Sequence, residues 1–293
     1  MIKRVIVIGA GNIGQHIAIV CARAGFDVSA YDVNPRALFN APDRFSAISQ
    51  DMGDDPMTVE EVVATLESIR CSTDPAELAA EAELLIESVP EDLKLKRNVL
   101  RQFNHLCPQS TIFATNASDI LPSQLAAASG RPDRFAALHF ANSNFVELMP
   151  HAGTSPEVMA DLQAFTKKLA QLTINLKVEQ PGLVINTMLM PLVFWSVMLA
   201  ANGVASVEDI DRAWMKTNGA SRGPFGVIDG IGIDTCLAVT RAAIRPFRDK
   251  QLRRNAAFFE SYVKQGRLGM SSLHGFYRYP YPKYKEPGFL RGE

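Results

Sequence analysis

The chain has 293 residues, of which 47% are hydrophobic and 21% are charged, and its formal net charge is -1 at pH 7. This length and composition are enough for a buried core and for roughly two domains. A net charge near zero, without a block of basic residues, provides no long-range attraction for polyanions, so nucleic acid is not expected as a partner.

The cysteines and the start of the chain indicate a compartment. Cys21, Cys71, Cys107 and Cys236 lie far apart, a pattern typical neither of a metal site nor of a disulfide framework. We expect free buried thiols, no metal and a reducing environment. The opening MIKRVIVIGAG leads directly into glycine-punctuated sequence instead of a secretory leader. A cytoplasmic protein is therefore predicted.

Residues 3–32, KRVIVIGAGNIGQHIAIVCARAGFDVSAYD, have the pattern of a strand, a glycine-rich turn, a helix and a second strand. Gly9 permits a tight turn, Gly11 lets the backbone approach a pyrophosphate, and Gly14 lets the helix pack closely on the strand. The N-terminus of the helix then faces the phosphates. The predicted phosphate-binding residues are Gly9, Gly11, Asn12, Ile13 and Gly14.

The second strand ends at Asp32, which lies 21 residues after Gly11, where a ribose 2'-hydroxyl is expected. A carboxylate there repels a 2'-phosphate, so NAD is favoured over NADP. Arg36 lies nearby and could turn toward such a phosphate. The alternative to a dinucleotide site is a doubly wound fold without a cofactor.

Further strands are predicted at residues 82–90, 111–118 and 134–140, with a helix at 91–106. This alternation predicts an α/β fold, a doubly wound parallel sheet covered by helices. Ligands bind such sheets beyond the C-terminal ends of the strands, where Glu91, Ser118 and His139 would lie. Glu87 and Asp119, near the same edge, are expected to be capping or solvated acids.

Residues 182–201, GLVINTMLMPLVFWSVMLAA, are uncharged and long enough to cross a bilayer. The run contains Asn186 and Pro191, however, and no cluster of Lys or Arg flanks it. We expect a helix buried between domains or subunits and no membrane contact. A membrane-associated protein is the alternative, and it would partition into detergent.

Taken together, the segments resemble the 3-hydroxyacyl-CoA dehydrogenase family, including its 3-hydroxybutyryl-CoA dehydrogenase and diketoreductase-like branch. The similarity extends along nearly the whole chain in a shared order. The segments that carry it are GAGNIGQHIA, IESVPEDLKLK, ATNASDILPSQLAA, RPDRFAALHFAN, PGLVINTMLMP, GVASVEDIDRAW, GPFGVIDGIGIDT and GRLGMSSLHGFYRYP.

The resemblance implies an NAD-dependent oxidoreductase that interconverts a 3-hydroxy and a 3-keto group. It implies a Rossmann-type cofactor domain at residues 1–181 and an all-helical domain at 182–293 that forms a homodimer. By matching positions, Glu91 and Lys96 would approach the nicotinamide ribose. Asn116 and Asn142 would belong to the cofactor site.

The resemblance also assigns the reaction centre: His139 is the base, Glu147 its carboxylate partner, and Ser118 and Asn186 contact the substrate. An imidazole suits proton removal from an alcohol as hydride leaves, and a carboxylate on its other nitrogen fixes the tautomer. Hydroxyl and amide groups can polarise the carbonyl in the reverse direction. The competing interpretations are that His139 only ends a strand and that Ser118 caps the following helix.

Two departures from the family affect this assignment. Glu147 lies only eight residues after His139, a shorter spacing than in relatives with a similar HFAN segment. A shorter hairpin could return the carboxylate to the imidazole, or could shift the strand by one register and turn it away. In the second case the chain would be a non-catalytic NAD-binding homologue with a dismantled dyad.

The second departure concerns CoA. Residues 38–67 carry one basic residue, Arg44, and seven acids: Asp43, Asp51, Asp54, Asp55, Glu60, Glu61 and Glu67. Such a surface repels the phosphates of CoA, although salt screens exposed charges. The alternative is a solvated acidic segment with no ligand role. A short 3-hydroxyacyl-CoA and a CoA-free 3-hydroxy acid or ester both remain candidates, and the acids favour the smaller substrate.

Overall fold

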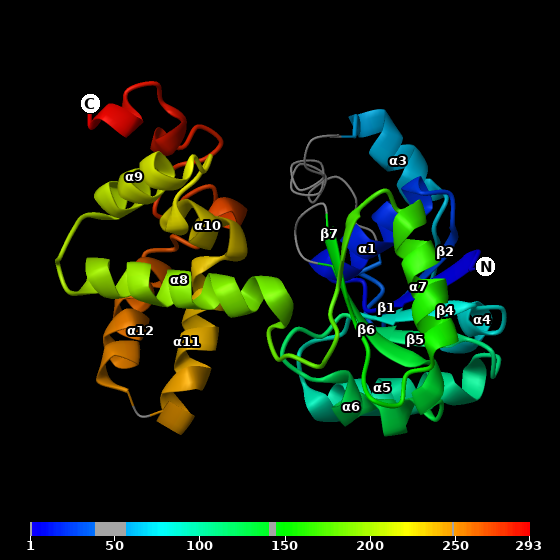
Figure 1. Cartoon of the computed structure of the whole chain (residues 1–293). Helices are drawn as coiled ribbons and strands as arrows, with labels where there is room; N and C mark the ends of the chain where they lie inside the picture. Colours follow the sequence, from blue (N-terminus) through cyan, green and yellow to red (C-terminus); the bar gives the residue numbers. More distant parts are fainter. Residues whose placement is uncertain (1, 39–56, 141–144, 248) are drawn as a thin grey trace. The chain divides into compact units, whose positions relative to one another are not determined.

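The computed structural model describes residues 2–38, 57–140, 145–247 and 249–293. The chain divides into two compact units, Met1–Asn186 and Thr187–Glu293 (Figure 1). The first is a helix-covered sheet and the second is helical. The predicted fold class, a Rossmann-type sheet followed by an all-helical domain, is confirmed.

Among the described residues the first unit holds an eight-stranded sheet, in the order β3-β2-β1-β4-β5-β6-β7-β8. Neighbouring strands are parallel except for β6 and β7, which are antiparallel. The predicted parallel sheet is thus confirmed for the other strand pairs, whereas β6 and β7 are antiparallel because a connection this short cannot join parallel neighbours. The strands are β1 Arg4–Ile8, β2 Asp27–Tyr31, β3 Arg70–Ser72, β4 Leu84–Glu87, β5 Ile112–Thr115, β6 Phe135–Phe140, β7 Phe145–Met149 and β8 Leu172–Asn175.

Helices cover both faces of this sheet, as Figure 1 shows. Alternate strand residues face opposite sides: Val5 and Val7 pack with α1, α3 and α7, while Ile6 and Ile8 pack with α4, α5 and α6. Burial on both faces explains why the strands are almost continuously apolar. The helices are α1 Asn12–Arg23, α3 Val59–Glu67, α4 Pro75–Ala79, α5 Leu93–Leu106, α6 Pro122–Leu125 and α7 Pro156–Lys168, with 3-10 turns at Ala126–Ser129 and Pro132–Arg134.

The second unit packs its helices around a core that includes Val197, Phe225, Ile228 and Phe259. The chain after the last long helix adds the buried rings of Tyr277, Tyr284 and Phe289. The elements are α8 Leu183–Ala201, which begins in the first unit, α9 Val207–Asn218, α10 Pro224–Ile231, α11 Ile233–Phe247 and α12 Lys250–Val263, with 3-10 turns at Met270–Ser272, Lys283–Lys285 and Phe289–Arg291.

Helix α8 is the uncharged segment singled out in the sequence. It is the one helix in the described residues that is long and apolar enough to span a membrane, with a mean hydropathy of 2.0. Only 22% of that window is buried inside the chain, and Trp195 is 58% exposed and Met188 60% exposed.

The thiols differ partly from expectation. Cys21, Cys107 and Cys236 are free and buried, but Cys71 is free and exposed. Cys71 lies on β3, a three-residue strand at the edge of the sheet, where cover is incomplete.

Two buried carboxylates organise the second unit. Asp211 accepts the backbone N–H groups of Phe225 and Gly226, at 2.8 and 3.0 Å, and the hydroxyl of Tyr277 at 2.9 Å. Asp229 accepts the N–H of Phe276 at 2.8 Å and that of Tyr277 at 2.9 Å. Asp211 thus holds the start of α10, and both acids attach the C-terminal segment to the helices.

The pKa of Asp211 should make the stability of the protein depend on pH. Burial raises this pKa from 3.8 to about 6, against the lowering effect of the N–H and hydroxyl donors. Because the pKa of Asp211 is higher in the folded state than in the unfolded state, the protonated carboxyl stabilises the folded protein. This stabilisation is complete below about pH 4 and is lost as the pH rises to about 6.

We therefore expect urea unfolding to show that the wild type loses on the order of 2–3 kcal/mol more than Asp211→Asn between those two pH values. Parallel pH profiles for the two proteins would contradict this assignment.

Candidate active site

The glycine-rich turn between β1 and α1 has the geometry of a phosphate cradle. Gly9 has φ +94°, and a Cβ there would lie 2.7 Å from the Ser88 carbonyl oxygen. A Cβ on Gly14 would lie 1.7 Å from the Gly9 oxygen, so neither position admits a side chain. A Cβ on Gly11 would meet nothing within 4 Å, which leaves the turn open to a ligand.

The N-terminus of α1 is available to that ligand. Gly11 is the N-cap and offers no side-chain hydrogen bond to the helix. The N–H groups of the first turn, which includes Asn12 and Ile13, have no partner inside the helix and carry the positive end of its dipole. Asn12 is exposed, and Ile13 packs partly against the sheet core. These residues fit the pyrophosphate of a dinucleotide.

Asp32 follows β2 and contacts the same turn. Its Oδ2 accepts the N–H of Ala10 at 2.8 Å, and its Oδ1 accepts the N–H of Asn34 at 2.8 Å. The carboxylate therefore has a structural role in the cradle in addition to the ribose contact expected of it.

Replacement of Asp32 should relax the discrimination between NADH and NADPH. Asp32→Ala removes the charge that repels a 2'-phosphate, and we expect the ratio of kcat/KM values to shift toward NADPH by roughly 10- to 100-fold. Asp32→Asn is the matched variant, because it removes the charge but keeps an oxygen for Ala10. Steady-state kinetics with both cofactors measures the effect, and an unchanged ratio in both variants would sink the assignment.

A buried ion pair lies where β4 ends. Lys96 Nζ, on α5, is 2.9 Å from Glu87 Oε1 and donates to the Val89 carbonyl at 2.9 Å. Glu87 also accepts the hydroxyl of Thr115 and the N–H of Val89, both at 2.7 Å. Glu91 Oε2 is 3.3 Å from the same ammonium. Glu87 is fully buried, so its expected role as a capping or solvated acid is wrong.

Glu91 links this network to the segment after β5. Its Oε1 accepts the N–H groups of Asp119 and Ile120, at 3.0 and 3.1 Å. The carbonyl of the preceding residue, Ser118, accepts the N–H of Gly182 at 2.8 Å. The pKa of Asp119 is raised overall, mainly by burial and then by the charge of Glu91. A lowering effect of His139 opposes this shift only in part.

Ser118 does not cap the next helix. Helix α6 begins at Pro122, and its N-cap is Leu121. The capping interpretation of Ser118 is therefore wrong.

The asparagine after β5 connects two strand ends. Asn116 Oδ1 accepts the N–H of Phe140 at 2.7 Å, which ties the end of β5 to the end of β6. The other predicted cofactor asparagine, Asn142, lies outside the described residues.

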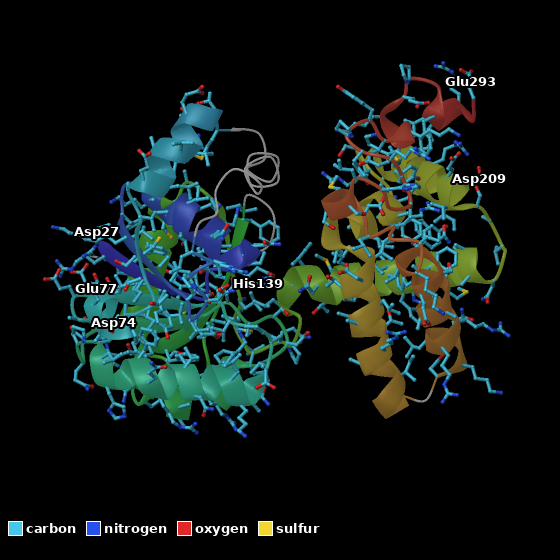
Figure 2. The ribbon with its side chains drawn as sticks, turned by 180° about the vertical axis from the view of Figure 1, so that it is seen from behind. Asp27, Asp74, Glu77, His139, Asp209 and Glu293 are labelled. Atoms are coloured by element: carbon cyan, nitrogen blue, oxygen red, sulfur yellow. The ribbon has the colours of Figure 1, made fainter. Side chains whose placement is uncertain are left out.

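His139 and Glu147 are direct partners in the antiparallel β6–β7 ladder, so their side chains share one face of the sheet. His139 Nδ1 lies 3.1 Å from Glu147 Oε2, with both residues buried. Figure 2 marks His139 among the side chains of the first unit. The register of β6 against β7 therefore brings the imidazole and the carboxylate together, although the two residues are closer in sequence than in the relatives.

The start of α8 reaches the same carboxylate. Glu147 Oε1 accepts the N–H groups of Val184 and Ile185, at 2.8 and 3.2 Å. Burial by itself raises the pKa of Glu147, but hydrogen bonds from His139 and from these two N–H groups lower it overall. Asn186 is the next residue in this turn, and its N–H donates to the carbonyl of Gly182.

The structure thus connects Ser118, His139, Glu147 and the helical turn of Asn186 through hydrogen bonds. The cofactor candidates gather at the ends of β1, β2, β4 and β5. Sequence reasoning missed the Glu87–Lys96 pair. Its only signal was a carboxylate ending the apolar run LLIE, nine residues before a lysine on the helix that follows.

This arrangement can move a proton. With Nδ1 directed at Glu147, Nε2 is the ring nitrogen left to exchange a proton with a ligand. Among the described residues, no three or more His, Cys, Asp or Glu side chains are arranged so that they could hold a metal ion.

Comparisons with known proteins agree along the chain. The family model described as 3-hydroxyacyl-CoA dehydrogenase, NAD binding domain, matches residues 4–179, and the model for the C-terminal domain of the same enzymes matches residues 182–279. A probable 3-hydroxybutyryl-CoA dehydrogenase of Bacillus subtilis (strain 168) is 32% identical over 283 residues, which cover 95% of this chain and 98% of that protein.

Two solved structures are also similar. One belongs to a diketoreductase described in the context of dual catalysis of dicarbonyl compounds. Its TM-score is 0.83 with 37% identity, covering 95% of this chain and 99% of that one. The other is (S)-3-hydroxybutyryl-CoA dehydrogenase from Ralstonia eutropha, with a TM-score of 0.76 and 30% identity, covering 96% of this chain and all of that one.

Proposed function

The chain belongs to the 3-hydroxyacyl-CoA dehydrogenase family, and we propose that His139 and Glu147 form the catalytic dyad of its reaction. It is an NAD-dependent oxidoreductase that interconverts a 3-hydroxy and a 3-keto group by hydride transfer. The observation that carries the proposal is the 3.1 Å contact between the imidazole and the buried carboxylate. The non-catalytic alternative required a dismantled dyad and is not favoured.

In the direction of oxidation, His139 Nε2 accepts the proton of the substrate hydroxyl, and Glu147 stabilises the imidazolium. In the reverse direction His139 returns that proton to the substrate oxygen. NAD, when bound, supplies the hydride acceptor at the nicotinamide. Ser118 and Asn186 hydrogen-bond the substrate oxygen and polarise the carbonyl.

The cradle and the strand ends support the following cofactor site. Gly9, Gly11, Asn12, Ile13 and Gly14 hold the pyrophosphate. Asp32 contacts the ribose, Glu91, Lys96 and Asn116 lie near the nicotinamide half, and the family resemblance also assigns Asn142 to the cofactor site. Residues 1–181 supply this cofactor domain, and residues 182–293 supply the helical domain.

The substrate is a short 3-hydroxyacyl group, either as a CoA thioester or as a CoA-free acid or ester. The names of the Bacillus subtilis relative and the Ralstonia eutropha structure favour the thioester, whereas that of the diketoreductase favours a dicarbonyl compound. Glu60, Glu61 and Glu67 lie on or beside α3, and Asp43, Asp51, Asp54 and Asp55 lie outside the described residues. This acidic segment favours the CoA-free substrate.

The test is NADH oxidation by the purified protein with acetoacetyl-CoA, acetoacetate and an ethyl 3-keto ester in parallel. We expect turnover, with the higher kcat/KM for a CoA-free compound. A clear preference for acetoacetyl-CoA would overturn the substrate choice alone. If NADH binds to the protein but none of the three compounds is reduced, the proposed activity is overturned.

The protein is further expected to be a cytoplasmic homodimer without membrane or nucleic-acid partners. The exposed apolar surface of α8, which includes Met188 and Trp195, supports burial against a second copy. Sedimentation in buffer without detergent should give twice the chain mass, and Trp195→Lys should shift it toward the monomer. A wild-type protein that requires detergent would favour membrane association instead.

A further inference from the structure

The carboxylate of Glu147 has two separate sets of partners. Its Oε2 contacts His139, while its Oε1 accepts the N–H groups of Val184 and Ile185. Glu147 has 0% solvent exposure, so these protein groups replace water around the charge. A single buried anion therefore joins the catalytic imidazole to the first turn of α8.

That turn carries Asn186. The N–H of Asn186 donates to the Gly182 carbonyl at 3.1 Å, and the N–H of Gly182 donates to the Ser118 carbonyl at 2.8 Å. The positive end of a helix dipole also favours a carboxylate at this position. The anion and the helix turn stabilise each other, and the turn is hydrogen-bonded to the segment of Ser118.

We propose that Glu147 is a positioning residue for substrate binding as well as for the base. Its Oε1 fixes the first turn of α8, and with it Asn186, independently of the contact between Oε2 and His139. This inference rests on the proposed function, in which Asn186 hydrogen-bonds the substrate oxygen. It predicts that a change at Glu147 weakens substrate binding even when His139 is absent.

Glu147→Gln separates the two roles in a background without the base. The amide keeps one oxygen that can accept the N–H groups of Val184 and Ile185 but loses the negative charge, so both these hydrogen bonds and the attraction to the start of α8 become weaker. In His139→Ala the orienting role no longer exists. Any remaining effect of Glu147→Gln on affinity must then come from α8.

The experiment is calorimetric titration of acetoacetyl-CoA and of an ethyl 3-keto ester into the complex with NAD+, which cannot react with a ketone. We expect His139→Ala/Glu147→Gln to bind the better of the two ligands roughly tenfold more weakly than His139→Ala. Adding Asn186→Ala should lower the ligand affinity of His139→Ala. The same substitution should change the ligand affinity of His139→Ala/Glu147→Gln little. Equal affinities, or fully additive effects of Glu147→Gln and Asn186→Ala, would overturn the proposal.

Glu179→Gln in the His139→Ala background is the matched control. Glu179 also accepts a backbone N–H, at 2.7 Å, but the donor is Ser123, which lies in α6 and not in α8, so the affinity should not change. If the double variant does not fold, Glu147→Asp replaces it, because the shorter acid keeps the charge but withdraws it from one set of partners. Lack of turnover by the wild type would overturn the proposed function, whereas equal affinities in an active protein overturn only this role of Glu147.

Discussion

His139→Ala is expected to lower kcat by roughly 100- to 10,000-fold, the range for loss of a general acid or base. His139 is the imidazole whose Nδ1 contacts a buried carboxylate, and Nε2 is left for the substrate. The affinity for NADH should change little, because the glycine-rich turn and Asp32 lie at the ends of other strands. Steady-state NADH oxidation gives kcat, and a fluorescence titration gives NADH affinity.

His151→Ala is the control for this prediction. The ring of His151 is occupied by the Pro132 carbonyl and the Gly153 N–H, at 2.9 and 3.1 Å, so its removal should leave kcat unchanged. An unchanged kcat in His139→Ala would show that another group transfers the proton.

Lys96→Met is expected to destabilise the protein by about 3–5 kcal/mol. The substitution removes the cation and leaves the Glu87 carboxylate buried, with a second acid, Glu91, nearby. The free energy of unfolding in urea measures the loss.

The cause can be isolated with a second substitution. Glu87→Gln in the Lys96→Met background removes the uncompensated charge, so the double variant should recover a large part of the lost stability. Arg70→Met is the exposed counterpart: its pair with Asp27 is 3.4 Å long with both side chains 53% exposed, and the expected loss is about 0–1 kcal/mol. A double variant less stable than Lys96→Met would contradict the charge argument.

The cofactor cradle could be predicted from the sequence because each part of it is local. The turn at Gly9, the close packing at Gly14 and the placement of Asp32 after β2 depend on residues within one strand-helix-strand segment. Hydrophobic periodicity also located β4, β5 and β6, although the predicted ranges 82–90 and 111–118 extend beyond both ends of β4 and β5. The helical second unit followed from the family resemblance.

The remaining features depend on contacts between distant segments. Pairing of His139 with Glu147 required the register of β6 against β7, which the shortened connection left open. Burial of Lys96 depends on how α5 lies over the end of β4, because composition predicts an exposed lysine. The contact of Glu147 with Val184 joins residues 37 positions apart, which no local pattern predicts.

The most direct test of the assigned activity follows the hydride itself. NADH carrying deuterium at both C4 positions is incubated with the protein and the 3-keto substrate that it turns over best, and the product is analysed by mass spectrometry. An NAD-dependent 3-hydroxy dehydrogenase places one deuterium on the carbinol carbon for each NADH oxidised. A hydroxy product without deuterium, or NADH that binds and is never oxidised, would contradict the account.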